Sequence, residues 1–307
     1  MVSSTRILVL GAGELGLSIL TALASLDPKP VLSVLLRPET LSSSDPKLAI
    51  LRDLSITAIP ADLSAIPHAE LTSLFKPFHT IIAANGASSS DSILKVAECV
   101  LSAGVPRFFP WQFGVDYDIV GLGSPARIWD TQYRVRQLLR DQPPPARTEW
   151  VIVSTGLFMS MLFMPAFGIV DLPHETVRAL NSWETQITTT DVSDIGRCIA
   201  GILDAEPPVR NEIVYLAGST VTYSELAQIL DDVLGRKLRR ECWSSEFLMQ
   251  ELKRLGGEAD DVVRYRSAFA RPTGVAWPVD DTWNLKRGLD MVGVEEYSRK
   301  HLLNGAD

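Results

Sequence analysis

Residues 6–16 read RILVLGAGELG, a short apolar run that leads directly into three glycines spaced Gly11-x-Gly13-x-x-Gly16. A strand, a tight glycine turn and an opening helix together make a dinucleotide-binding fingerprint, and this context makes the match stronger than the spacing alone. Gly11 permits the turn, Gly13 lets the backbone approach a pyrophosphate, and Gly16 lets the helix pack closely on the strand. The turn Gly11-Ala12-Gly13-Glu14-Leu15-Gly16 therefore predicts a dinucleotide whose pyrophosphate lies at the start of a helix.

Short apolar runs alternate with helical patterns through the rest of the first half. Such runs, separated by helices, are typical of a parallel sheet that is covered on both faces. We therefore expect a doubly wound α/β Rossmann domain over residues 1–155. The expected strands are Arg6–Leu10, Val31–Leu36, Thr57–Ile59, Thr80–Ala84, Arg107–Phe109 and Trp150–Val153, and the expected helices include Leu15–Leu26, Asp91–Ala103 and Ala126–Leu139.

The regular alternation of strand and helix patterns changes after Val153. The tail from Cys242 onward is rich in aromatic residues and shows no strand alternation. We expect residues 156–307 to form a smaller, mostly helical C-terminal lobe for the substrate. Some of its strands and helices should return in part to the Rossmann sheet. The uncharged stretch Val151–Val170 has the length of a membrane span. Its β-branched start and internal proline and glycines favour a buried strand followed by a segment that lines a pocket.

The composition excludes several classes of protein. A net charge of −8 over 307 residues, with no basic run, argues against nucleic-acid binding and against a polybasic membrane contact. The first apolar stretch is too short for a signal peptide. Cys99, Cys198 and Cys242 are far apart, which predicts buried, reduced thiols in a cytoplasmic protein. The four histidines are scattered, so we expect no metal site.

The residue after the second expected strand indicates which dinucleotide is bound. An acidic side chain there would hold the ribose 2′-hydroxyl of NAD(H), whereas an arginine suits the 2′-phosphate of NADP(H). This chain has Arg37 at that position, and Lys47 follows as a candidate second positive charge. The sequence therefore favours NADP(H), although a solvent-exposed Arg and Lys pair is the alternative interpretation.

Two further loops leave the carboxyl ends of expected strands, where ligands of doubly wound sheets bind. Ala84 and Asn85 close the fourth strand, and the small alanine would let the backbone pass the adenine and ribose. The loop Trp111-Gln112-Phe113 follows the fifth strand and should border the nicotinamide. A plain turn and ordinary core packing are the alternatives for these two loops.

An apolar segment after the sixth strand is the candidate substrate pocket. Flexible Met and Phe side chains adapt to a bulky polycyclic molecule, although core packing explains them equally well. With the loop after the fifth strand, the predicted pocket residues are Trp111, Phe113, Phe158, Met159, Phe163 and Met164.

Several motifs recur together in one known family. The glycine turn, the Arg37…Asp45-Pro46-Lys47 stretch, residues 109–114 (FPWQFG) and residues 191–197 (DVSDIGR) occur in that order along almost the whole chain. The sequence resembles the NmrA-like and isoflavone reductase-like family of atypical short-chain dehydrogenase/reductases. Residues 111–118 (WQFGVDYD) are most similar to its fungal members. The resemblance implies a Rossmann domain, NADP(H), a small C-terminal lobe, and aromatic or alkaloid-like secondary metabolites as substrates.

One departure from this family concerns the proton donor. The resemblance implies an active-site lysine three residues before a Val/Ile-Arg pair, and here the residue before Val135-Arg136 at that spacing is Gln132. A glutamine does not exchange protons usefully near neutral pH. No Tyr-x-x-x-Lys pair replaces it, because Gly121 follows Tyr117 and Gln137 follows Tyr133 at that spacing. Beside Gln132, the candidate catalytic residues are Asp130, Tyr133 and Tyr117.

The leading hypothesis is an NADPH-dependent reductase of a C=C, C=N or C–O bond in an apolar small molecule. A substrate that already carries a positive charge would need no acid, which fits Gln132. Two alternatives remain at this stage. One is an NADP(H)-assisted cyclisation or rearrangement, and the other is a regulator of the NmrA type that senses NADP(H) and binds a protein partner without catalysis.

Overall fold

The computed structural model describes residues 5–86, 90–124, 127–145, 148–256 and 261–303. The chain divides into two compact units that are interleaved in the sequence. Unit 1 comprises Met1–Gln112, Thr131–Val153 and Ile195–Val214, and unit 2 comprises Phe113–Asp130, Ser154–Asp194 and Tyr215–Asp307. The boundary expected after residue 155 differs from this division, because Ile195–Val214, which contains most of a helix and of an edge strand, belongs to the first unit. A partial return of C-terminal elements to the sheet was itself expected.

Unit 1 is built on a seven-stranded sheet whose order is β11-β6-β5-β4-β1-β2-β3. Strands β1 to β6 pair in parallel, and their order is that of a Rossmann sheet. The expected strands agree with the structure to within one residue at either end. The strands are β1 (Arg6–Leu10), β2 (Val31–Leu36), β3 (Thr57–Pro60), β4 (Thr80–Ala83), β5 (Arg107–Phe109), β6 (Glu149–Ser154) and β11 (Glu212–Tyr215).

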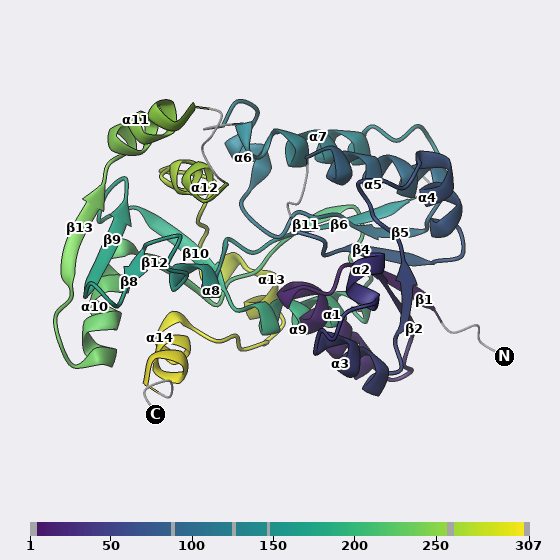
Figure 1. The fold of residues 1–307 in the computed structure, drawn as a ribbon, viewed down its shortest axis with the longest axis horizontal. Coiled ribbons are helices and arrows are strands. Elements are labelled where there is room, and N and C mark those ends of the chain that lie inside the picture. The colour runs from purple at the N-terminus through teal and green to yellow at the C-terminus, as the bar shows by residue number, and fades with distance from the viewer. Residues whose placement is uncertain (1–4, 87–89, 125–126, 146–147, 257–260, 304–307) are drawn as a thin grey trace. The chain divides into compact units, whose positions relative to one another are not determined.

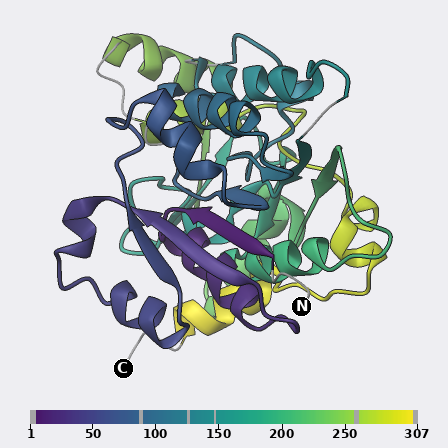
Figure 2. The same cartoon turned by 90° about the vertical axis from the view of Figure 1, so that its right-hand side faces the viewer.

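Helices cover both faces of this sheet (Figures 1 and 2). Helices α4, α5 and α7 share one buried apolar cluster with Leu8 and Leu10 of β1. The intervening Ile7 and Val9 point to the other face, as strand alternation requires, and α1 and α9 lie on that side. The helices of this unit are α1 (Glu14–Ala24), α2 (Pro38–Leu41), α3 (Lys47–Asp53), α4 (His68–Phe75), α5 (Ser90–Ala103), α7 (Asp130–Arg140) and α9 (Val192–Leu203).

Helix α7 begins four residues later than the expected Ala126, and Ala126 itself lies outside the described residues. The preceding loop is held by the first residue of the helix. Asp130 accepts hydrogen bonds from the backbone N–H of Gly123 at 2.9 Å and from Nε of Arg127 at 3.0 Å. Arg127 also has φ of +54°, which is incompatible with a helix.

Unit 2 contains two three-stranded sheets, β12-β10-β7 and β13-β9-β8, in addition to its helices. One apolar cluster joins both sheets to α10, α11 and α12. The elements are α6 (Tyr117–Val120), β7 (Leu157–Phe158), α8 (Met159–Leu162), β8 (Val170–Asp171), β9 (Thr176–Leu180), β10 (Gln186–Thr190), β12 (Ser219–Thr222), α10 (Tyr223–Leu234), β13 (Arg239–Trp243), α11 (Ser245–Leu255), α12 (Asp261–Phe269), α13 (Trp283–Lys286) and α14 (Val294–Ser298), with short irregular helical turns at Val279–Asp281 and Arg299–Leu303.

The expectation that all three cysteines are buried is wrong for one of them. Cys99 and Cys198 are buried, but Cys242 is exposed. It lies on β13, an edge strand of its sheet, and alternate side chains of an edge strand face away from the core. All three are free thiols.

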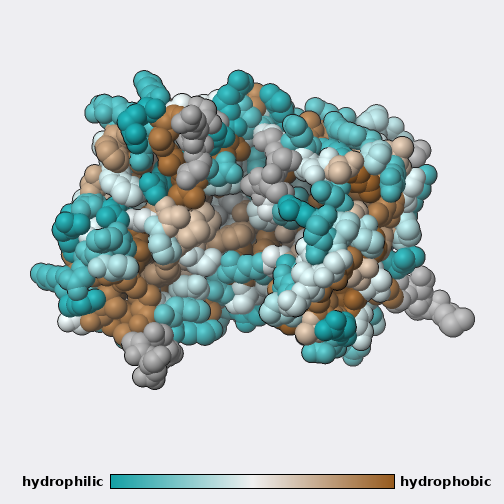
Figure 3. All heavy atoms as spheres, viewed as in Figure 1, coloured by the Kyte–Doolittle hydropathy of each residue, from teal (hydrophilic) through white to brown (hydrophobic). Residues whose placement is uncertain are grey.

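The uncharged stretch that begins at Val151 starts as a buried strand, as expected. Within the described part of the chain, no helix combines the length and the apolar character needed to cross a membrane. Hydrophilic residues are interspersed with smaller hydrophobic groups on the face shown in Figure 3.

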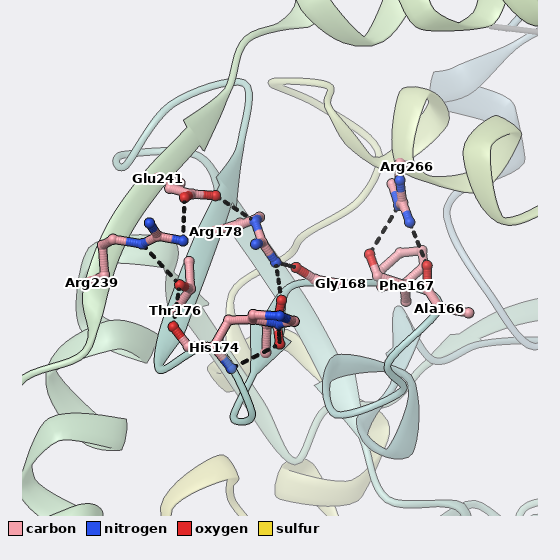
Figure 4. A network of polar contacts seen from close by, with 10 residues as sticks. Ala166, Phe167, Gly168, His174, Thr176, Arg178, Arg239, Glu241 and Arg266 are labelled. Atoms are coloured by element: carbon pink, nitrogen blue, oxygen red, sulfur yellow. Dashed lines mark hydrogen bonds and ion pairs between the residues drawn. The ribbon is translucent and has the colours of Figure 1, made fainter.

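A partly buried arginine joins the strands of the β13-β9-β8 sheet (Figure 4). Arg178 donates from Nε to Glu241 at 2.6 Å and from Nη1 to Asp171 at 3.0 Å and to the Gly168 carbonyl at 2.9 Å. Its side chain is only 13% exposed. These hydrogen bonds raise the pKa of the guanidinium against the opposing effect of burial, which is the largest single influence.

Replacing Arg178 with methionine is expected to lower the free energy of unfolding by about 2–4 kcal/mol, because the partly buried carboxylates of Asp171 and Glu241 each lose one charged partner. Urea unfolding followed by circular dichroism measures this loss. Arg236→Met is the matched control, since Arg236 and Glu175 form an exposed pair in the same unit whose loss should cost less than about 1 kcal/mol. Equal losses of unfolding free energy in the two variants would contradict the stabilising role of Arg178.

Candidate functional site

The glycine turn lies at the carboxyl end of β1, where the sheet order reverses between β1 and β4. Gly11 has φ of +98°, and a Cβ there would lie 3.0 Å from the carbonyl oxygen of Ala84. A Cβ at Gly16 would lie 2.2 Å from the carbonyl oxygen of Gly11. The close approach of α1 to the turn, and of the turn to β4, therefore explains two of the three glycines.

The third glycine has a different environment. A Cβ at Gly13 would meet nothing within 4 Å, so protein packing does not require a glycine there. Gly13 is the N-cap of α1 and, as a glycine, it has no side chain with which to cap the helix. A ligand anion could therefore take the place of a capping side chain at the start of this 11-residue helix. This arrangement fits a pyrophosphate.

The other residues of the turn have separate roles. Ala12 and Leu15 are buried at 4% exposure each and anchor the turn to the sheet. Glu14 is exposed in the first turn of α1. These positions support the prediction that the turn holds a dinucleotide through its backbone.

Arg37 is exposed directly after β2 and begins the short helix α2 as its N-cap. The pKa of Asp62, which follows β3, is lowered chiefly by a hydrogen bond from the Ser64 hydroxyl and also by the charge of Arg37. Arg37 thus lies at the carboxyl edge of the sheet, and its role as a ligand of the 2′-phosphate stays a prediction.

Lys47 is less available to bind a phosphate than the sequence suggested. Its Nζ lies 2.6 Å from Oδ2 of Asp45, and this hydrogen bond is the main reason that the pKa of Asp45 is lowered. The charge of Lys47 is thus partly offset by its neighbour. A contact between Lys47 and the cofactor stays a prediction.

The end of β4 is held close to the glycine turn. The backbone N–H of Ala84 donates to the Leu10 carbonyl at 3.0 Å, and Ala84 is 5% exposed. The small side chain expected at this position faces Gly16, where an added Cβ would lie 3.7 Å from the Ala84 Cβ. Asn85 follows it, half-buried, at the same edge of the sheet.

Gln112, in the loop after β5, is fully buried, and both ends of its amide are bonded to the protein. Nε2 donates to the backbone carbonyl of Gln132 at 2.8 Å, and Oε1 accepts from Nε of Arg136 at 2.9 Å. The side chain of Gln112 thus has a structural role, and the predicted contact of this residue with a cofactor stays a prediction.

The two aromatic residues of the same loop lie in different units. Trp111 is half-buried and packs against the apolar cluster of α4, α5 and α7 in unit 1. Phe113 is the first residue of unit 2 and is buried. This contact supports the interpretation that Trp111 packs against the core. Its role in a substrate pocket stays a prediction.

The sequence did not reveal the role of Arg136. This side chain has no solvent exposure although an arginine usually reaches water. It lies on α7 four residues after Gln132, so the two residues share one helix face. The one signal of this burial in the sequence was an arginine at a helix position where the spacing predicts an apolar residue.

Gln132 has an amide oxygen with no hydrogen-bond partner among the described residues, and this oxygen is buried. The whole residue is 3% exposed. An unpartnered buried polar atom is costly, and such atoms in native proteins are commonly explained by function, water or an ion.

The other three candidate proton donors have structural surroundings. Asp130 bonds to the loop before α7 as described above. Tyr117 is buried in the core of unit 2, edge-on to Trp129 with ring centroids 6.1 Å apart. Tyr133 is half-buried on α7, next to Gln132 in sequence. Their catalytic roles stay predictions, and these surroundings explain Asp130 and Tyr117 without one.

The predicted pocket residues of the second half all belong to unit 2. Met159 is fully buried in its core, and Phe163 and Met164 pack against that core. Phe163 also stacks on Tyr297 with centroids 5.5 Å apart. Phe158 is half-buried and outside the core cluster. Core packing thus explains Met159, whereas Phe158, Phe163 and Met164 keep partly exposed apolar surface.

Two cavities of about 380 and 350 Å³ lie at the opposite, amino edge of the unit 1 sheet. Both are lined by His79 and Arg107, which sequence analysis did not single out. Arg107 donates to the Val209 carbonyl at 2.8 Å, beyond the end of α9. Burial, together with the charge of Arg107, lowers the pKa of His79. A search of the described residues for three clustered His, Cys, Asp or Glu side chains finds none that would hold a metal ion.

Comparison with known proteins identifies the family. The model of the NmrA-like family matches residues 3–287. The chain belongs to the NmrA-like family. An NmrA-like family domain-containing oxidoreductase of Gibberella moniliformis is 43% identical over 302 residues, which cover 96% of this chain and 97% of that protein. Phenylcoumaran benzylic ether reductase 1 of Arabidopsis thaliana is 27% identical, with 82% of each chain covered.

Solved structures agree with this NmrA-like assignment at the level of the fold. An isoflavone reductase aligns with a TM-score of 0.78 over 97% of this chain and 99% of its own, at 18% identity. The leucoanthocyanidin reductase of Vitis vinifera, solved as a binary complex with NADPH, aligns with a TM-score of 0.77 over the same shares, also at 18% identity. The resemblance to an isoflavone reductase-like, NmrA-like fold is thereby confirmed.

Proposed function

We propose that this NmrA-like protein is an NADP(H)-dependent oxidoreductase. The observation that carries the proposal is the glycine turn, in which a Cβ at Gly13 would meet nothing within 4 Å and the N-cap residue of α1 has no side chain of its own. Arg37 at the adjacent edge supplies the charge for a 2′-phosphate. The fungal relative that is 43% identical is named an oxidoreductase, which supports the same activity here.

The residues present fit the cofactor in separate roles. Gly13 and the first turn of α1 would hold the pyrophosphate, Arg37 would hold the 2′-phosphate, and Ala84 and Asn85 would border the adenosine half. Bound NADPH would supply a hydride. The chain contributes binding, orientation and the polar groups nearest the reacting bond.

We infer that the substrate is an apolar aromatic or alkaloid-type small molecule that is reduced at a C=C, C=N or C–O bond. The partly exposed Phe158, Phe163 and Met164 favour an apolar ligand. Relatives named phenylcoumaran benzylic ether reductase act, by their names, on an aromatic ether. Gln132 in place of the family lysine separates this chain from an ordinary reductase of that kind.

Arg37→Asp tests the cofactor. We expect this change to weaken NADPH binding by about 10- to 100-fold and NADH binding by less than threefold, because only NADPH has the 2′-phosphate. Fluorescence titration of both nucleotides measures the two affinities. Lys47→Met is the control for the partly neutralised second cation and should reduce NADPH affinity less than Arg37→Asp does. Equal loss of NADPH and NADH would refute the role of Arg37.

A regulator that binds NADP(H) without catalysis is the second candidate, and Gln132 favours it because glutamine supplies no general acid. Oxidation of NADPH measured with a panel of apolar quinones, iminium ions and benzylic ethers separates the two functions. Tight NADPH binding without turnover of any of these substrates would support the regulator. Turnover that is lost in Gly13→Ala would support the enzyme.

A further inference from the structure

The side-chain amide of Gln132 is set apart from the polar network that fixes its backbone. Gln112 bonds to the carbonyl oxygen of Gln132, and Arg136 holds Gln112 from the next turn of α7. The network ends at the backbone and does not include Oε1 of Gln132. The backbone position of residue 132 is thus defined while its amide oxygen still needs a donor.

The location of this amide oxygen suggests where the donor comes from. Gln132 lies in the first turn of α7 and is tied to the loop at the carboxyl end of β5. The carboxyl ends of parallel strands share one edge of a sheet, and that edge also carries Gly13 and Arg37. The residue that carries the unpartnered oxygen is therefore held at the edge at which the proposed cofactor binds.

The chemistry of an amide limits the roles that the Gln132 side chain can have at this edge of the sheet. A glutamine oxygen accepts a hydrogen bond, and the side chain has no proton to give to a substrate near neutral pH. A reaction at this position therefore lacks the acid that a lysine ammonium would provide. The reaction balances without an acid only if the reacting group already carries a positive charge.

We propose that Gln132 is a substrate-binding residue that selects a protonated imine, with its amide oxygen accepting the N–H of the C=N bond. This inference rests on the proposed function and narrows its substrate class from three bond types to one. The iminium carbon takes up a hydride, with its electron pair, from the reduced nicotinamide. The π electrons of the C=N bond become the lone pair of the product amine, and the nicotinamide becomes oxidised, so no proton is needed from the protein.

The test compares two cations that differ in one hydrogen-bond donor. Protonated dihydroisoquinoline has the N–H, and N-methyl-dihydroisoquinolinium has the same charge without it. We expect wild-type kcat/KM to favour the N–H cation by at least about 10-fold, because a site built around a hydrogen bond rejects an analogue that lacks it. With protonated dihydroisoquinoline, the rate should fall as pH rises through the pKa of the imine.

Three variants separate hydrogen bonding from charge. Gln132→Met has similar length without an acceptor and should abolish the preference for the N–H cation. Gln132→Glu keeps an acceptor and adds a negative charge, so it should retain the preference and bind both cations more tightly. Gln132→Lys places a cation against a cationic substrate and should lower activity on both by about 10-fold or more.

A binding measurement makes the test independent of turnover. Calorimetric titration of the protein–NADP⁺ complex with protonated tetrahydroisoquinoline and with N,N-dimethyl-tetrahydroisoquinolinium, which has the same charge and no N–H, should show the same preference in wild type and its loss in Gln132→Met. NADPH affinity and thermal stability, measured on the same samples, should match wild type in Gln132→Met, whereas the charge that Gln132→Glu or Gln132→Lys buries should lower thermal stability.

Two results would overturn the inference, and they are distinguishable. Wild-type protein that binds NADPH and reduces a neutral quinone or alkene, yet shows no preference between the two cations, would refute the role of Gln132 and leave the proposed function standing. Protein that fails to bind NADPH would remove both. A preference that persists unchanged in Gln132→Met would assign the selection to another residue and also refute the inference.

Discussion

Gly13→Ala is expected to reduce NADPH affinity by about 100-fold or more while the protein stays folded. A Cβ at this position meets no protein atom within 4 Å, but it would occupy the space through which a pyrophosphate approaches the backbone. Because alanine is a poorer N-cap than glycine, the free energy of unfolding should fall by no more than about 1 kcal/mol. Fluorescence titration with NADPH and urea unfolding measure the two quantities.

Gly16→Ala is the matched control and should show the reverse balance. Its Cβ would lie 2.2 Å from a backbone oxygen of the same turn, so the helix and the strand must separate. We expect a loss of about 3 kcal/mol or more in the free energy of unfolding. A Gly13→Ala variant that binds NADPH as wild type does would contradict the placement of the pyrophosphate, whatever happens to Gly16→Ala.

Gly156→Ala is expected to cause the largest loss of stability in unit 2, about 4 kcal/mol or more. Gly156 has φ of +68°, and its Cβ would lie 2.1 Å from the carbonyl oxygen of Thr188. Thr188 lies on β10, which pairs with β7. The clash would displace the strand that leads into the apolar segment with Phe158 and Phe163.

Gly235→Ala separates backbone strain from this clash. Gly235 ends α10 with φ of +64°, close to that of Gly156, and a Cβ there would meet nothing within 4 Å. It should therefore cost only the left-handed strain, about 1 kcal/mol. Thermal unfolding of both variants gives the comparison. Similar melting temperatures for the two would show that the approach of Thr188 is unimportant.

The Rossmann sheet was predictable from the sequence because its signals are local. Each strand from β1 to β6 is a short apolar run, and the first glycine turn follows β1 directly. A partial return of C-terminal elements to the sheet was expected, but the segments that exchange between the two units were not predictable, because the exchange depends on which distant segments pack together. Residues 113–130 follow β5 yet belong to unit 2, and α9 with β11 returns to unit 1. No local pattern marks either exchange.

The candidate site was predictable where a backbone role determines the residue type. Gly11 and Gly16 follow from steric limits that the structure reproduces, and Arg37 follows from its place after β2. Hydrogen-bond partners of side chains were harder to predict from the sequence. The engagement of Gln112 by Arg136 joins a loop to a helix turn 24 residues away, and a sequence pattern does not encode such a pairing. The exposure of Cys242 was missed for a related reason, since it depends on β13 being an edge strand.

The placement of β11 has a consequence for synthesis of the chain. The sheet of unit 1 acquires β1 to β6 by residue 154, but its outer strand is not made until residues 212–215. A nascent chain therefore presents the backbone edge of β6 without a partner while about 60 further residues are translated, several seconds at ordinary ribosome speeds. Unpaired strand edges are sites of mispairing between chains. Fragments that end before residue 212 should accordingly aggregate more readily than the full chain when both are expressed alike.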